Sequence, residues 1–362
     1  MKKYLIAIVV ILVAAAMILV PLLKSDPEIV EPTEDAPALF TFKENLISKF
    51  GDEISIEAEI LSDEVKFVKA VFDDTVLFEK ENPTGKVSFP FNGTYRGVGA
   101  KKFNLEVTLK DGTEFVDNRI VRVLSDVIPE QLKVNIEKTY PHLTTNFTQG
   151  LEFYKGKLFE STGQYGQSFV AEVDINSGAV NENRKMGLDA THFGEGITIL
   201  NDVIYQLTWQ KQKCITYDLG DNIVPKSEFN YIGEGWGLTN DGTYLIMSNG
   251  SERITFRNPK TFLVERTIEV YDEQGPRLAL NELEYIDGKI YANVWQSADV
   301  LVIDPETGRV LQVIDGTNLL IGQGPDREVM NGIAHDESTD RIFMTGKNWK
   351  SLFQVEFVKI AS

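Results

Sequence analysis

Much of the chain alternates apolar and polar residues with the period of two that is typical of half-buried β-strands. Residues 54–60 and 103–109 show it clearly, because every second side chain in them is apolar. Turn-forming pairs such as Asn92-Gly93 and Asp111-Gly112 separate about seven such runs in about ninety residues. This density predicts a small Ig-like antiparallel β-sandwich over residues 38–128, which we interpret as a spacer or docking module, with a carbohydrate- or protein-binding role as the alternative.

The rest of the chain repeats one pattern five times. Each repeat starts with an apolar strand centred on one aliphatic residue, and these reference residues are Leu151, Ile197, Leu238, Leu283 and Ile333. A turn and two further strands follow in each unit, without a helical period. Units of three to four strands and about 45 residues are typical of propeller blades. The pattern therefore predicts an all-β fold in which residues 129–362 form a five-bladed β-propeller.

The fifth repeat contains three strand patterns and lacks a fourth. Its third strand covers residues 352–357, and residues 132–137 form an unassigned strand pattern ahead of the first repeat. We expect these two segments to pair, so that residues 132–137 supply the missing strand and close the ring.

Residues 4–23 form an uncharged apolar run of about the length that crosses a bilayer as a helix. Its length favours an uncleaved membrane anchor over a cleaved signal peptide, although both alternatives stay open. Lysines precede the run and acidic residues follow it, which predicts that the bulk of the chain lies in the periplasm or at the cell surface. The protein is secreted if the segment is cleaved. Residues 1–24 are assigned to this segment, and the proline- and acid-rich residues 25–37 to an extended tether.

Composition and charge narrow the classes of function. The chain has 54 acidic and 36 basic side chains and a net charge of -18, which argues against a nucleic-acid partner. Cys214 is the single cysteine, and His142, His192 and His335 are widely separated. Structural and catalytic zinc sites need several such ligands at short spacing, so we interpret the histidines as structural and expect no zinc. The oligomeric state is left open.

The repeats place one set of side chains at an opening of the predicted propeller, because the first strand of each blade lines the central axis. Two positions before the reference residues stand Gln149, Glu195, Trp236, Asn281 and Asn331. The second strands return to the same end at Gly163, Trp209, Gly250, Trp295 and Lys347, and Phe147 and Phe193 lie one strand step further out. Single tryptophans often only fill the interior of a propeller, but three at equivalent positions favour a binding site.

Glu195 is the single acidic residue among these five ring positions. It stands between Gly194 and Gly196 and follows Phe193. We expect burial among aromatic side chains to raise the pKa of its carboxyl toward the working pH, which would make it a proton shuttle. Glu234 is a rival carboxylate one step further out.

Motifs from about Tyr140 to Phe357 resemble those of the plant and bacterial glutaminyl-peptide cyclotransferases, in order and at matching spacing. They include Phe147-Thr148-Gln149-Gly150-Leu151, Phe193-Gly194-Glu195-Gly196-Ile197-Thr198, Glu234-Gly235-Trp236-Gly237-Leu238-Thr239, Leu280-Asn281-Glu282-Leu283-Glu284-Tyr285 and Thr345-Gly346-Lys347. The resemblance implies a five-bladed propeller that converts the N-terminal glutamine of peptides or proteins to pyroglutamate with release of ammonia. It implies no required cofactor, and it is compatible with a structural metal ion away from the site, whose ligands the sequence does not identify.

The resemblance also implies roles for single residues. It assigns the acid/base carboxylate to Glu195, the aromatic walls to Phe147, Phe193, Trp209, Trp236 and Trp295, and the polar substrate contacts to Gln149, Asn281 and Lys347. We expect the carboxylate to carry a proton from the substrate amine to the leaving nitrogen. The alternative function is a surface-tethered propeller that binds peptides or glycans without turnover.

Overall fold

The computed structural model describes residues 36–42, 46–72 and 75–360. These residues form 28 β-strands and one short 3₁₀ helix, η1 (Thr317–Leu320), so the predicted all-β class is confirmed. The predicted membrane segment at residues 4–23 and most of the tether lie outside the described residues. Within the described part, no helix is long and apolar enough to cross a membrane. The last tether residues are an exception to the expected extended spacer, because Ala36 and Pro37 are buried and the Pro37 carbonyl accepts hydrogen bonds from Leu61 and Ser62.

The chain divides into two compact units. The first contains the described residues up to Ile47 together with Glu53–Phe91 and Lys101–Val121, and the second contains Ser48–Asp52, Asn92–Ala100 and the chain from Arg122 onward.

Residues 38–124 form two sheets built from eight strands, one strand more than the periodicity predicts. The strands are β1 (Ala38–Phe40), β2 (Leu46–Lys49), β3 (Glu53–Ile60), β4 (Val65–Phe72), β5 (Thr75–Glu81), β6 (Lys86–Asn92), β7 (Gly99–Leu109) and β8 (Glu114–Leu124). One sheet has the order β1-β3-β6 and the other β2-β8-β7-β4-β5. β1 and β2 span only three and four residues, which is too short for an alternating pattern to reveal them. Phe72, Phe91 and Phe103 contact one another in the core.

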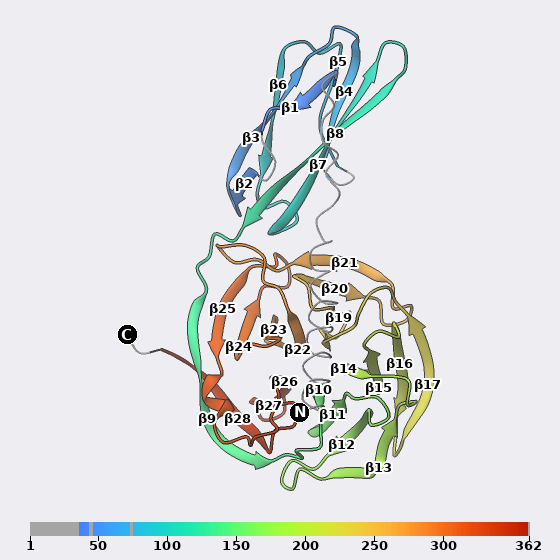
Figure 1. The fold of residues 1–362 in the computed structure, drawn as a ribbon, viewed down its shortest axis with the longest axis vertical. Coiled ribbons are helices and arrows are strands. Elements are labelled where there is room, and N and C mark those ends of the chain that lie inside the picture. The colour runs from blue at the N-terminus through green and yellow to red at the C-terminus, as the bar shows by residue number, and fades with distance from the viewer. Residues whose placement is uncertain (1–35, 43–45, 73–74, 361–362) are drawn as a thin grey trace, which may run out of the picture. The chain divides into compact units, whose positions relative to one another are not determined.

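The rest of the chain forms five similar antiparallel arrays. Their strands are β10 (Thr148–Tyr154), β11 (Lys157–Thr162), β12 (Phe169–Val173) and β13 (Val180–Gly187); β14 (Gly194–Leu200), β15 (Val203–Thr208), β16 (Lys213–Leu219) and β17 (Ile223–Asn230); β18 (Leu238–Asn240), β19 (Leu245–Ser248), β20 (Arg253–Arg257) and β21 (Val264–Glu269); β22 (Leu280–Ile286), β23 (Lys289–Val294), β24 (Asp299–Ile303) and β25 (Val310–Asp315); and β26 (Met330–Asp336), β27 (Arg341–Gly346) and β28 (Ser351–Lys359). The first strands of the arrays contact one another in a closed circle, β10 to β14, β18, β22, β26 and back to β10. Figure 1 shows the arrays around this centre.

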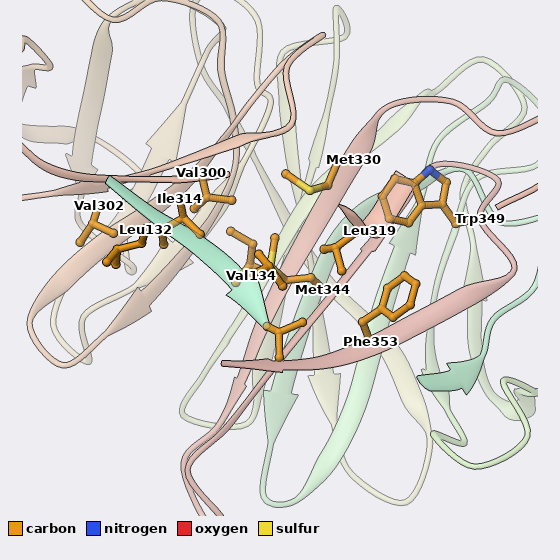
Figure 2. Close-up of a cluster of buried hydrophobic side chains, with 12 residues drawn as sticks. Leu132, Val134, Val300, Val302, Ile314, Leu319, Met330, Met344, Trp349 and Phe353 are labelled. Atoms are coloured by element: carbon orange, nitrogen blue, oxygen red, sulfur yellow. The ribbon is translucent and has the colours of Figure 1, made fainter. Parts of the chain in front are cut away.

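β9 (Glu130–Pro141) completes the fifth array. It pairs antiparallel with β28, with Val134 opposite Phe357, and parallel with β25. The predicted pairing of residues 132–137 with residues 352–357 is therefore confirmed. Leu132 and Val134 of β9 lie in one buried cluster with side chains of both neighbouring arrays, including Ile314 and Phe353 (Figure 2).

Four of the five first strands are irregular at one end. The register of the hydrogen-bonded ladder shifts between Thr148 and Gly150, Gly194 and Ile197, Leu280 and Leu283, and Met330 and Ile333. A β-bulge leaves a residue out of the ladder and turns its side chain, and bulges are frequent next to active sites. The irregular stretches contain Gln149, Glu195, Asn281 and Asn331, which are four of the five predicted ring positions.

Candidate active site

The second strands return to the predicted end of the arrays in matching register. In four arrays a backbone N–H donates to the carbonyl of the residue four positions before the reference residue, in the pairs Gly163 to Phe147, Trp209 to Phe193, Trp295 to Ala279 and Lys347 to Val329. The third array departs from this register, because the N–H of Gly250 donates instead to Leu280 of the next array. The repeat alignment therefore placed four of the five second-strand positions correctly.

The five predicted wall residues, which we call the aromatic cluster, are Phe147, Phe193, Trp209, Trp236 and Trp295. Their rings form two separate groups, and neighbouring rings contact one another within each group. Phe193 meets Phe147 at 6.0 Å and Trp209 at 5.8 Å between ring centroids, and Trp236 meets Trp295 at 5.7 Å. Trp236 is buried, whereas the other four are partly exposed. The predicted polar residues are all buried, namely Glu195, Gln149, Asn281 and Lys347. They are therefore better shielded from solvent than four of the five aromatic side chains.

A chain of buried hydrogen bonds holds the backbone of Glu195. Its carbonyl accepts a hydrogen bond from Ser161 Oγ (2.6 Å), which in turn accepts one from Gln206 Nε2 (2.9 Å). Gln206 Oε1 accepts from the hydroxyl of Tyr217 (3.0 Å), and all these groups are buried. The network runs through the first three strands of one array and the second strand of the preceding one, so it ties Glu195 to both.

The two glycines beside Glu195 allow adjacent strands to approach closely. A Cβ at Gly194 would overlap the carbonyl oxygen of Thr162, and one at Gly196 would come within 2.5 Å of Leu238 N and 2.7 Å of Trp236 O. The N–H of Gly196 donates to that Trp236 carbonyl at 2.7 Å. The glycines thus let the backbone of Glu195 pack closely between neighbouring arrays. This close packing explains why glycine stands on both sides of Glu195 in the sequence.

Burial raises the pKa of Glu195 well above its usual value, the charge of Lys347 lowers it, and the charge of Glu234 raises it further. The direction of this shift agrees with the expectation from the sequence. Burial also lowers the pKa of Lys347 to about 8, against the charges of Glu195 and Glu328. Lys347 Nζ lies 4.9 Å from the ring centroid of Phe147, so the cation also contacts the aromatic cluster.

Gln149 and Asn281 occupy the expected positions with different surroundings. Asn331 Nδ2 donates to Gln149 Oε1 (3.3 Å) and to the carbonyl of Thr148 (3.1 Å), which leaves Gln149 Nε2 as the end of the amide that can donate to a ligand. The Asn281 carbonyl accepts from Ser248 Oγ (2.7 Å). Among the described residues, no hydrogen bond joins the Asn281 side chain to another predicted site residue.

Two residues at this site make contacts that the sequence did not predict, namely Glu234, which was considered only as a rival carboxylate, and Tyr165. Glu234 accepts hydrogen bonds from the indole nitrogens of both Trp209 and Trp236. Tyr165 is half exposed and meets Phe193 at 5.4 Å between centroids, which extends the aromatic cluster outward. Neither contact is visible in a repeat alignment, since both residues lie in loops outside the aligned strands.

The three histidines contact other groups, and His192 Nδ1 lies 3.8 Å from Asp189 Oδ1. His142 is buried and bridges the Trp349 carbonyl (2.8 Å) and Glu160 (3.1 Å), and His335 contacts Asp340 at 3.0 Å. Among the described residues, no group of three or more His, Cys, Asp or Glu side chains is arranged to hold a metal ion.

A separate cavity of about 1090 Å³ opens among the far ends of the same first strands. Buried Glu152 and Glu284 line it together with His335. It contains none of the predicted site residues, so its size does not make it the candidate active site.

The comparisons with known proteins agree with this geometry. The family model described as glutamine cyclotransferase matches residues 114–357. A glutaminyl-peptide cyclotransferase of Arabidopsis thaliana is 39% identical over 233 residues, which cover 62% of this chain and 71% of that protein. The crystal structure of a Myxococcus xanthus glutaminyl cyclase is similar with a TM-score of 0.61 and 36% identity, and covers 65% of this chain and 100% of that one. The chain therefore belongs to the glutamine cyclotransferase family.

Proposed function

We propose that this protein converts the N-terminal glutamine of peptides and proteins to pyroglutamate and releases ammonia. The observation that carries this proposal is the buried carboxyl group of Glu195, which stands in the irregular stretch of β14 and interacts electrostatically with Lys347. Family membership supports the same reaction.

We propose further that the five arrays are the blades of a five-bladed β-propeller at residues 129–362, and that residues 38–128 form an Ig-like accessory sandwich. The closed circle of first strands and the β9–β28 pairing support the first assignment. The order of the two N-terminal sheets supports the second.

Glu195 would move one proton in each half of the reaction. The neutral α-amine attacks the side-chain amide carbon of the same glutamine, so that a carbon–nitrogen bond forms and a tetrahedral oxyanion results. The Glu195 carboxylate accepts the proton that the amine loses, then gives it to the amide nitrogen as that nitrogen leaves as ammonia. An α-amine has a pKa of about 8. The raised pKa of Glu195 brings the carboxyl closer to that value, which makes transfer in both directions less costly.

Other groups would stabilise the oxyanion and exclude water. Gln149 Nε2, Lys347 Nζ and the amide of Asn281 are donors of the kind that a developing negative charge needs. The aromatic cluster would hold the short apolar stem of glutamine and keep out water that could hydrolyse the amide instead. Phe147 also contacts Lys347, which supports a lysine held near the substrate.

We propose that the reaction needs no metal ion, because one carboxyl group can carry out both proton transfers. Protein dialysed against EDTA should keep its activity, measured as ammonia release. Loss of activity that added zinc restores would contradict this proposal, while a fall in thermal stability without loss of activity would indicate a structural ion.

The sequence alone supports a proposal on location, namely that residues 4–23 attach the protein to a membrane with the bulk outside the cytoplasm. Fractionation of cells that produce the full chain tests it. The protein should stay with membranes after a salt wash and become accessible to added protease without cell lysis.

The experiment that tests the function uses a peptide with N-terminal glutamine and mass spectrometry. The peptide should lose the mass of one ammonia molecule faster than it does spontaneously. A matched peptide with an acetylated N-terminus lacks the nucleophile and should not change. If the first peptide binds but is not converted, the alternative of a propeller that binds peptides without turnover is correct.

A further inference from the structure

Glu234 joins the two groups of the aromatic cluster. It lies in the loop between β17 and β18, and its Oε2 accepts hydrogen bonds from Trp209 Nε1 (2.7 Å) and Trp236 Nε1 (3.0 Å). Its other oxygen, Oε1, accepts from Gln210 Nε2 (3.3 Å). An indole has one N–H and cannot accept a hydrogen bond there, so each ring takes its orientation from the acceptor that it meets.

The loop around Glu234 is built to hold the carboxylate in this place. Gly233 has a φ of +89°, a conformation that other residues rarely adopt, and a Cβ at Gly235 would overlap the hydroxyl oxygen of Tyr231. That hydroxyl donates to the Thr208 carbonyl, and the N–H of Gly235 donates to Trp209 O (3.4 Å). Both contacts tie the loop to the end of β15 and to Trp209, the residue that follows this strand.

We propose that Glu234 is the positioning residue of this site, whose carboxylate fixes the indoles of Trp209 and Trp236 and thereby the aromatic walls around the substrate's N-terminal glutamine. The proposal rests on the proposed function. Trp209 contacts Phe193, and Trp236 contacts Trp295. Among the described residues, no ring contact joins these two pairs, and Glu234 is the link between them.

The position of Glu234 also affects the reacting carboxyl group. The titratable groups that face Glu195 are Lys347, Glu234 and Tyr231. Glu234 is a like charge, so it opposes ionisation of Glu195, while Lys347 favours it. Removal of the Glu234 charge should therefore lower the pKa of Glu195.

Three variants of the full chain test the proposal. Glu234→Ala removes the acceptor, Glu234→Gln keeps a carbonyl oxygen but removes the charge, and Glu228→Gln changes an exposed carboxylate on β17 that pairs with Lys213 outside the site. Rates of cyclisation are measured against peptide concentration and pH. The indole N–H resonances of the four tryptophans are recorded by NMR after ¹⁵N-tryptophan labelling.

In Glu234→Ala we expect two of the four indole resonances to move and KM to rise about tenfold, the size that loss of a charge-assisted hydrogen bond gives. Glu234→Gln should recover most of the KM, because its amide oxygen still accepts from an indole. The acidic limb of its kcat/KM profile should move to lower pH, because the pKa of Glu195 falls. Glu228→Gln should match the wild type in all respects.

Two outcomes would overturn the proposal. One is that Glu234→Ala leaves the indole resonances and KM unchanged. The other is that Glu234→Gln is as inactive as Glu195→Gln with its indole resonances in place, which would make Glu234 a reacting group. If the wild type itself does not cyclise the peptide, the proposed function fails, and the NMR and the peptide's dissociation constant still decide the role of Glu234.

Discussion

Glu195 is held through its backbone and shielded by neighbouring side chains. Its flanking glycines and the preceding Phe193 indicated burial from the sequence, and the direction of its pKa shift agrees with that expectation. The hydrogen bonds that Ser161 and Gln206 donate could not be predicted from the sequence. Both residues lie on strands, and the ordinary alternation of polar and apolar positions explains their polar side chains without any such bond. The two hydrogen bonds that Glu234 accepts from indole nitrogens could not be predicted either, because Glu234 lies in a loop outside the aligned strands.

Gly163 gives a residue-scale prediction about the aromatic cluster. A Cβ at this position would overlap the ring of Phe193 and come within 3.1 Å of Gln149 Cγ. Gly163→Ala should therefore displace Phe193 and raise KM about tenfold, with a loss of stability of about 1–3 kcal/mol. Gly187→Ala is the matched control, since a methyl group at that position would meet no heavy atom within 4 Å. Equal KM values for the two variants would remove Phe193 from the substrate site.

At the scale of elements, the repeat alignment predicted the order of strands and the register of four hairpins. It could not predict the bulges, because a register shift depends on hydrogen bonds between strands rather than on periodicity. The third array differs for a related reason. Its first strand β18 is only three residues long and starts at Leu238, so Trp236 precedes the strand.

β9 carries the element-scale prediction. Leu132 is buried between β25 and β28, so Leu132→Ala should lower the free energy of unfolding by about 2–5 kcal/mol. Ile136 on the same strand is 38% exposed, and Ile136→Ala should change the free energy of unfolding by less than about 0.5 kcal/mol. Urea unfolding followed by tryptophan fluorescence measures both, because all four tryptophans belong to the second unit. Similar losses in the two variants would mean that β9 does not close the ring.

At the scale of the whole molecule, buried carboxyl groups gather where the five first strands meet. Four arrays have glycine directly before the reference residue, while the fourth has Glu282. Its carboxyl accepts hydrogen bonds from Leu151 N (3.3 Å) and Ile333 N (2.9 Å) of two other arrays. Burial raises the pKa of Glu152 to about 8, and those of Glu282 and Glu284 well above the usual value. A sequence cannot reveal this cluster, because the three residues meet only in the closed ring.

These shifts predict how stability depends on pH. A carboxyl group whose pKa is raised by folding binds its proton more tightly in the folded state, so its contribution is complete below about pH 4.5 and is lost as the pH rises to about 8. The melting temperature should fall over this range. Glu152→Gln cannot ionise, so its melting temperature should fall by several degrees less. The same fall in both proteins would show that Glu152 ionises as easily in the folded chain as in the unfolded one.

The proposed reaction depends on the carboxyl group of Glu195 to transfer the proton during cyclisation. The most direct test is the rate of ammonia release from a peptide with N-terminal glutamine by purified Glu195→Gln and by the wild type. We expect a kcat lower by about 10²–10⁴, with KM and melting temperature close to those of the wild type. A Glu195→Gln protein that cyclises the peptide at nearly the wild-type rate would contradict this role.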